Sequence, residues 1–202
     1  MPPLVREKTL DVCALARARS QRLTSSHQTV GRLTGLDVVL PNLRPGLCRW
    51  VFSTLPLRMG REIYIELHHD GSTVLAVNVS WKALRDDDMA DPATTDILVD
   101  VDVVGAGCRD ALALAYELAR HLGVDSSVNI TMVVATAEPS PLVPVITEYG
   151  SFRAIPDHAR RPRRIQSVTA LITPADEDDL LRASTQETFT NLMHQFGITA
   201  YL

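Results

Sequence analysis

Residues 103–123, VVGAGCRDALALAYELARHLG, place two glycines between a run of β-branched residues and a run rich in alanine and leucine. The preceding run, ILVDVDVV (97–104), alternates apolar residues with aspartate, as a strand with one solvated face does. In residues 108–122 apolar side chains recur at helical spacing, and Gly123 stands where a helix C-cap belongs. The sequence therefore predicts a strand, a tight turn at Gly105 and Gly107, and a helix.

This order of strand, glycines and helix looks like the fingerprint of flavin and nicotinamide enzymes, in which a helix N-terminus holds a pyrophosphate. Gly105 and Gly107 fill the first two glycine positions, which makes them the candidate cofactor-binding residues. Asp110 fills the third, where its side chain would obstruct close packing and its charge would repel the diphosphate. The next expected strand, residues 128–136, contains no acidic residue for a ribose. We therefore favour a turn without a ligand, assign no cofactor, and keep a dinucleotide- or nucleotide-binding enzyme as the alternative hypothesis.

A hairpin is the clearest local feature N-terminal to this stretch. Residues 61–81, REIYIELHHDGSTVLAVNVSW, hold Asp70-Gly71 between two alternating runs, which is the strongest short-range signal for a β-hairpin. The alternation puts Ile63, Ile65 and Leu67 on one face. Further strands are expected at 36–41, 47–55, 128–136 (apolar enough to be central) and 165–173, with a turn at 42–46 and an extended or looped path at 138–145.

Two more helices are expected near the ends of the chain. One covers residues 5–23, and the other opens at Thr173-Pro174 and ends at Gly197. The expected buried face of the second consists of Leu180, Leu181, Phe189, Leu192, Met193 and Phe196. The order predicts the α+β class: a mixed, mostly antiparallel sheet with a central β-hairpin and two to three helices packed mainly on one face. We expect one domain over residues 1–202, with residues 1–30 as a separable N-terminal helical arm.

Composition restricts the classes of partner. A net charge of −4 gives no overall positive field for nucleic acid, so such binding needs a local patch. Cys13, Cys48 and Cys108 lie far apart, without C-x-x-C spacing, which favours a reducing compartment. The sequence shows no secretory signal and no run long enough to span a bilayer. We therefore expect a cytoplasmic protein without a membrane partner.

The local patch is found in residues 153–164, RAIPDHARRPRR. Four arginines fall within five residues, and prolines at 156 and 162 keep the segment extended. These candidate nucleic-acid- or phosphate-binding residues are Arg160, Arg161, Arg163 and Arg164. Guanidinium groups pair well with phosphate oxygens. The alternatives are a solvated loop, or ion pairs with residues 176–179 or with a partner's carboxylates.

Other side chains that could carry chemistry follow no motif. His68 and His69 are adjacent on a strand and face opposite sides, which favours two solvated histidines over a shared metal. Residues 86–88 are three successive aspartates without an EF-hand pattern. No nucleophile motif is found, so we assign neither a catalytic residue nor a metal ligand and lean towards a protein without enzymatic activity.

Three phrases resemble a known family in their order: REIYIELHHDGSTVLAVNVS (61–80), LVPVITEYGSFRAIPDHARRPRRIQSVTALI (142–172) and LLRASTQETFTNLMHQFGI (180–198). They are similar to the C-terminal region of uncharacterised actinobacterial proteins that carry an AlbA/Schlafen-type DNA-binding domain upstream. The upstream domain's glutamate-rich E-F-K strand and A-N-G-G-type turn are absent from residues 1–59. The resemblance covers about residues 60–198, implies a companion module without the DNA-binding half, and transfers no site residue.

Together these features favour a non-catalytic cytoplasmic interaction or regulatory module. An unidentified protein is the expected partner, nucleic acid is a second candidate through the arginine-rich loop, and a homo-oligomer is compatible with the sequence.

Overall fold

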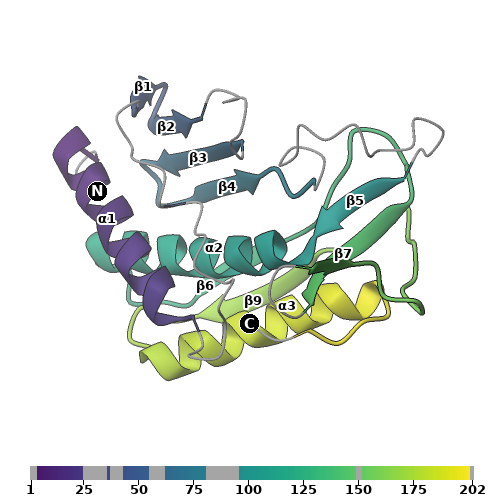
Figure 1. The fold of residues 1–202 in the computed structure, drawn as a ribbon. Coiled ribbons are helices and arrows are strands. Elements are labelled where there is room, and N and C mark those ends of the chain that lie inside the picture. The colour runs from purple at the N-terminus through teal and green to yellow at the C-terminus, as the bar shows by residue number, and fades with distance from the viewer. Residues whose placement is uncertain are drawn as a thin grey trace.

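The computed structural model describes residues 4–24, 36, 43–54, 62–80, 96–148 and 152–200. The class is α+β, as predicted (Figure 1). The elements follow in the order α1 (Arg6–Arg22), β1 (Arg44–Gly46), β2 (Arg49–Ser53), β3 (Ile63–His68), β4 (Thr73–Val77), β5 (Ile97–Asp100), α2 (Val101–His121), β6 (Val128–Met132), β7 (Leu142–Glu148), β8 (Phe152–Ala154), β9 (Val168–Ile172) and α3 (Asp178–Gln195).

The described strands divide among three sheets instead of forming the single mixed sheet expected. One sheet has the order β1-β2-β3-β4 and is antiparallel throughout. A second has the order β5-β7-β8, with β5 parallel to β7, and the third pairs β6 with β9. An isolated bridge between Ser80, three residues after β4, and Val99 links that part of the chain to β5.

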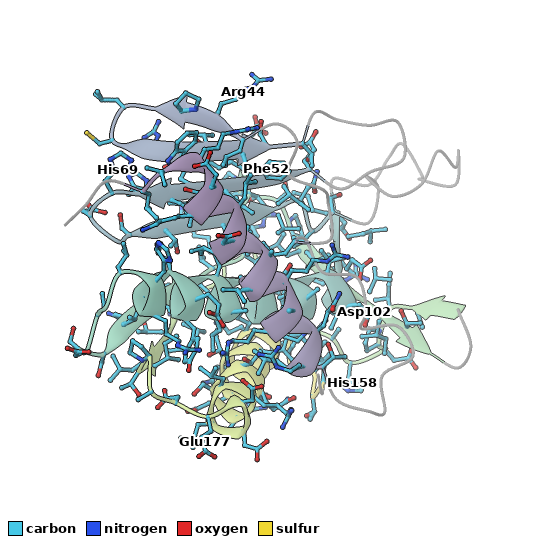
Figure 2. All side chains as sticks on the ribbon, turned by 90° about the vertical axis from the view of Figure 1, so that its left-hand side faces the viewer. Arg44, Phe52, His69, Asp102, His158 and Glu177 are labelled. Atoms are coloured by element: carbon cyan, nitrogen blue, oxygen red, sulfur yellow. The ribbon has the colours of Figure 1, made fainter. Side chains whose placement is uncertain are left out.

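Helix α2 is the centre of the molecule. Figures 1 and 2 both show it below the four-stranded sheet, with α3 on its far side, and α2 also contacts β6. The residues of α2 contribute to three separate core clusters, for example Leu114, Val104 and Leu112 respectively. Because one helix supplies all three cores, its start and its faces decide where every other element packs.

The hairpin at Asp70-Gly71 is confirmed. β3 pairs with β4 so that Ile65 lies opposite Leu75, and Ile63, Ile65 and Leu67 are buried against α1 and α2. The Asp70 carboxylate accepts bonds from the backbone and hydroxyl of Ser72, at 2.9 and 2.7 Å, which closes the turn. Alternation and turn chemistry thus fix the register of this pair.

The predicted start of α2 is wrong. β5 ends at Asp100, and α2 begins at Val101 rather than at residue 108. The Asp100 side chain caps the helix by accepting bonds from the amides of Asp102 and Val103, at 3.1 and 3.3 Å. The valines after Asp100 prefer β structure. The aspartate N-cap and the packing of the apolar face of the helix against strands on both sides outweigh that preference.

The predicted start of α3 is also wrong. Its N-cap is Glu177, whereas Thr173 and Asp176 bond to each other in the turn before it. Leu180, expected inside, is 59% exposed, while Leu181 is buried. Adjacent residues lie about 100° apart around a helix, so the packing of α3 buries Leu181 and leaves its neighbour Leu180 at the surface.

The remaining predictions are mixed. Helix 5–23 is confirmed as α1, and strands 47–55 and 165–173 as β2 and β9. Residues 44–46 form β1 rather than a turn, and β8 was not predicted. Among the described strands β6 pairs only with β9, so it is not central. The strand expected at 36–41 lies outside the described residues apart from Leu36.

Candidate nucleic-acid interface

The arginine segment, defined here as residues 160–164, runs between the C-terminus of α3 and the start of β7. The amide of Arg160 donates to the carbonyl of Phe196 at 2.7 Å, and the amide of Leu142 donates to the carbonyl of Pro162 at 2.8 Å. Just beyond the segment, Ile165 is buried in the cluster that contains Phe196. These anchors hold the backbone of the segment although it has no regular secondary structure.

A reciprocal pair of hydrogen bonds fixes the far end of the segment. The Gln195 side chain accepts from the amide of Gln166 at 2.7 Å and donates to its carbonyl at 3.0 Å. At the near end, Ala159 donates to Pro156 across a turn at 3.0 Å. The arginine side chains therefore project from a path that is fixed on both sides.

All four arginines of the segment are exposed, as predicted. Arg161 forms an ion pair with Asp96 at 3.0 Å, and within the described part of the chain it is the only one of the four in an ion pair. Residues 157–166 contain a single carboxylate, Asp157. The segment therefore carries an excess of positive charge that the described residues leave open to solvent.

The alternative pairing of these arginines with residues 176–179 is not found in the structure. Asp178 pairs with Arg19 and Arg22, and Asp179 pairs with Arg182. Figure 2 places His158, which precedes the segment, in the lower part of the molecule, well below Arg44 of the four-stranded sheet.

The two candidate cofactor-binding glycines lie inside α2, four and six residues after its first residue, Val101. The strand-to-helix turn is made at Asp100, so neither glycine forms it. Inside a helix, backbone amides bond to carbonyls of the preceding turn rather than to a ligand. A Cβ added at Gly107 would meet no atom within 4 Å, so close packing does not require a glycine there. Cofactor binding at Gly105 and Gly107 has thus lost its geometric basis.

Asp110 does not lie in the first turn of a helix as expected. It is fully buried in the middle of α2, where its carboxylate accepts from the Ser20 hydroxyl at 2.6 Å and from the Leu36 amide at 3.2 Å. Asp110 therefore joins α2 to α1 and to Leu36. This role follows from tertiary packing, which the spacing of glycines could not reveal.

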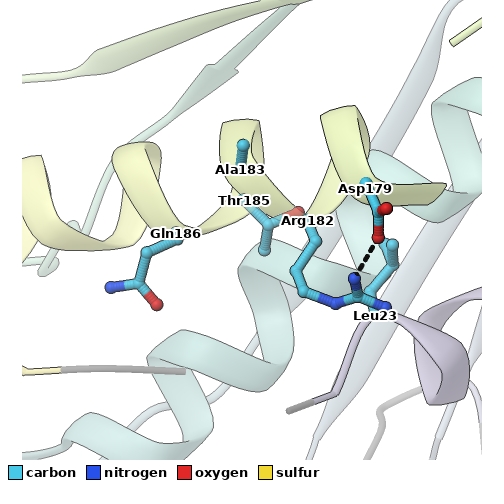
Figure 3. Close-up of a pocket in the computed structure, with 6 residues that line it drawn as sticks. All are labelled: Leu23, Asp179, Arg182, Ala183, Thr185 and Gln186. Atoms are coloured by element: carbon cyan, nitrogen blue, oxygen red, sulfur yellow. Dashed lines mark hydrogen bonds and ion pairs between the residues drawn. The ribbon is translucent and has the colours of Figure 1, made fainter. Parts of the chain in front are cut away.

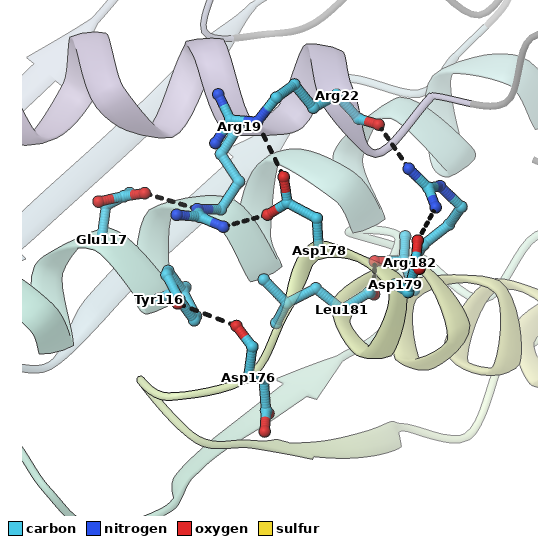
Figure 4. Close-up of polar contacts among 10 residues, drawn as sticks. Arg19, Arg22, Tyr116, Glu117, Asp176, Asp178, Asp179, Leu181 and Arg182 are labelled. Atoms are coloured by element: carbon cyan, nitrogen blue, oxygen red, sulfur yellow. Dashed lines mark hydrogen bonds and ion pairs between the residues drawn. The ribbon is translucent and has the colours of Figure 1, made fainter.

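A network of charged residues joins all three helices and was missed in the sequence (Figure 4). Arg19 Nε lies 2.5 Å from Glu117 Oε1, its Nη1 pairs with Asp178, and its guanidinium lies 4.0 Å from the centre of the Tyr116 ring. Arg22 Nε lies 2.9 Å from the other oxygen of Asp178. The hydrogen bond from Arg22, with the charge of Arg19 in addition, lowers the pKa of the Asp178 carboxyl. The only sequence signal was the cluster of arginines near the end of α1.

A small cavity of about 300 Å³ adjoins this network (Figure 3). Its one cation, Arg182, bonds to Asp179 at 2.5 Å and to the carbonyl of Arg22 at 3.0 Å. Because the charge of Arg182 is already neutralised, the cavity offers less to an anion than the arginine segment does.

The sequence suggested that His68 is solvated, but in the structure its side chain has a carboxylate partner. Its Nε2 lies 2.7 Å from Glu66 Oε2, and the other oxygen of Glu66 accepts from the Tyr64 hydroxyl and lies 3.3 Å from Arg49 Nε. The hydrogen bond from Tyr64 is the largest cause of the lowered pKa of Glu66, and it raises the pKa of Tyr64 in return. Glu66 is thus surrounded by donors on the face of β3 opposite the core.

No group of three or more metal-binding side chains occurs among the described residues, and residues 86–88 lie outside them. No helix in the described ranges has the length and apolar character needed to cross a membrane. Comparison of the chain with protein-family models, curated proteins and solved structures finds no significant match.

Proposed function

We propose that this chain is a non-catalytic interaction module, working in the cytoplasm, that binds the phosphate backbone of nucleic acid through the arginine segment. The observation that carries the proposal is the combination of a fixed backbone with four exposed guanidiniums. Arginine stays protonated at every physiological pH, which suits permanent binding of anions rather than proton transfer.

The dimensions of the segment fit a short stretch of backbone. Five extended residues span about 16 Å, and a nucleic-acid strand presents one phosphate per about 3.4 Å of axis. The segment is thus as long as about five phosphates of one strand, so a strand that runs along it offers at least one phosphate to each guanidinium. Such contacts position a nucleic acid without reading its sequence. We therefore expect weak, salt-dependent binding with little preference among sequences.

The test measures the binding of a labelled 20-nucleotide DNA, single-stranded and duplex, between about 25 and 200 mM salt. We expect log K to fall linearly with log salt, by about 0.9 per phosphate contact on duplex. Replacing Arg160, Arg161, Arg163 and Arg164 with glutamine should remove most of that slope and lower affinity by about tenfold or more at the lower salt concentrations.

A matched control removes four charges elsewhere. Arg6, Lys8, Arg44 and Arg120 are exposed and lie outside the segment, and their replacement by glutamine changes net charge by the same amount. This control should keep the slope of the wild-type chain. Equal losses in both variants, or wild-type binding without salt dependence, would show that the segment is not the interface.

A further inference from the structure

A groove of about 790 Å³ runs along α2, on a part of the molecule that the arginine segment does not reach. Its floor is a row of small side chains at helical spacing, Gly107, Ala111, Ala115 and Ala119. Its two walls are β4 and β6. Every residue in the ranges 73–77 and 128–134 lines the groove, whichever way its side chain points. The strands therefore present their edges to the groove, not one of their faces.

Both edges belong to the ends of sheets. β4 pairs with β3 on its other side, and β6 pairs with β9. Within the described ranges neither residues 73–77 nor β6 has a second neighbouring strand. A strand edge offers a row of backbone donors and acceptors to any extended chain that comes beside it. Here two such rows face one groove.

The size of the groove fits one strand. A strand of five residues is about 17 Å long, strands lie about 4.8 Å apart within a sheet, and layers pack about 10 Å apart, so one strand fills about 800 Å³. β4 and β6 are each five residues long. Because the side chains of α2 on the floor of the groove are small, the backbone of an added strand can lie close to the helix.

The charge of the groove restricts its occupant further. Asp70 is the one charged residue among those lining the groove, and its carboxylate already accepts from Ser72 in the hairpin turn. Exposed apolar residues also occur here: Val133, which lines the groove, is 53% exposed, and Leu171, opposite Asn129 in β9, is 66% exposed. Charged side chains would lose hydration in such a groove without gaining a partner. The complementary occupant is therefore uncharged.

We propose that this groove is the docking site for an extended, uncharged segment of a partner protein. The segment pairs as a β-strand with the edges of β4 and β6 and joins the two sheets into one across α2. In this mode of recognition the main-chain hydrogen bonds supply affinity, while side chains supply specificity. A generic strand peptide is therefore a sufficient probe.

The test titrates the full chain with a capped heptapeptide that alternates threonine and valine, followed by NMR and amide hydrogen exchange. We expect saturable shifts confined to residues 73–77, 128–134 and the facing side of α2, and slower exchange of edge amides in β4 and β6. The same peptide with a central proline lacks a donor and should not bind. A peptide with lysine at alternate positions should bind at least tenfold more weakly.

A matched pair of variants locates the binding. Ala111→Trp fills the floor of the groove and should abolish the shifts, whereas Ala14→Trp adds the same bulk to an exposed position of α1 that does not line the groove. Circular dichroism checks that both variants fold. The proposal is overturned if the peptide does not bind, or if Ala111→Trp binds it as well as Ala14→Trp does. A wild-type dimer that Ala111→Trp dissociates would also overturn it, because the occupant would then be a second copy of the chain.

Discussion

The backbone amide of Arg160 donates a 2.7 Å hydrogen bond to the carbonyl of Phe196, the C-cap residue of α3. The next residue, Gly197, has φ +71°, and a Cβ placed on it would lie 3.1 Å from Cγ of Arg160. The end of the last helix therefore shapes the first arginine of the proposed interface. Any change there should alter stability and binding together.

Gly197→Ala tests this connection. A non-glycine residue in the left-handed region costs about 1 kcal/mol, and the added methyl group must also displace the Arg160 side chain. Gly123→Ala is the matched control, since Gly123 has φ +66° but no atom within 4 Å of its added Cβ. We expect urea unfolding to show a lower free energy of unfolding in both variants, and we expect DNA binding to change only in Gly197→Ala. Unchanged DNA binding in Gly197→Ala would show that the C-terminal end of α3 does not influence the interface.

Acid should weaken the connection between α1 and α3 through Asp178. The hydrogen bond from Arg22 is the largest cause that lowers the pKa of this carboxyl in the folded state. A lowered folded pKa adds stability that is complete above the unfolded value of about 3.9 and is lost as pH falls through the folded pKa. In urea unfolding from about pH 6 to pH 2.5, the wild-type chain should have the larger free energy of unfolding, and its difference from Asp178→Asn should shrink as pH falls. Arg22→Gln should reduce that narrowing, and a constant advantage would contradict the assignment.

The three thiols should differ sharply in reactivity. Burial raises the pKa of Cys13 and of Cys108 to about 12, whereas Cys48 is exposed. Because the thiolate is the reactive form, an aromatic disulfide reagent at pH 8 should modify one thiol quickly and the other two only after denaturation. Cys48→Ser should remove the fast phase. A fast phase that remains in this variant would mean that α1 or α2 opens readily.

Local signals predicted the hairpin, but they misplaced α2. The Asp70-Gly71 turn and the alternation around it are fixed by neighbours in sequence, so β3 and β4 were predicted correctly. Val101, Val103 and Val104 favour a strand by propensity, yet they lie in α2 because the helix is buried between strands on both sides. Tertiary packing decides the conformation of such a run, and local sequence patterns do not reveal that packing.

The same division holds for the candidate sites. The exposure of the arginine segment was predictable, because prolines and clustered charges rarely enter a core. Its anchors were not, since Phe196 and Leu142 are distant in sequence. The groove depends on the placement of β4, α2 and β6 relative to one another. No periodic pattern of apolar residues in the sequence indicates how these three elements are placed.

Breaking the ion pair between Arg19 and Glu117 should cost more stability than breaking any exposed pair in the described residues. The two residues are 98 positions apart in the chain, and their side chains are only 8% and 6% exposed. Removing one member of a buried pair leaves an unpaired buried charge, which costs about 3–5 kcal/mol. Arg19→Met should therefore destabilise the chain strongly in urea unfolding, whereas Arg182→Met, whose partner Asp179 is 87% exposed, should cost less than about 1 kcal/mol.

A double-mutant cycle separates the pair from the packing around it. Combining Arg19→Met with Glu117→Leu removes both charges and fills the space with apolar atoms, so the double variant should be more stable than Arg19→Met alone. Asp178 keeps its bond to Arg22 in both variants and does not obscure the comparison. If the two substitutions add without coupling, the stability of this junction comes from the Arg19 guanidinium stacked on the Tyr116 ring, and the charge on Glu117 contributes nothing.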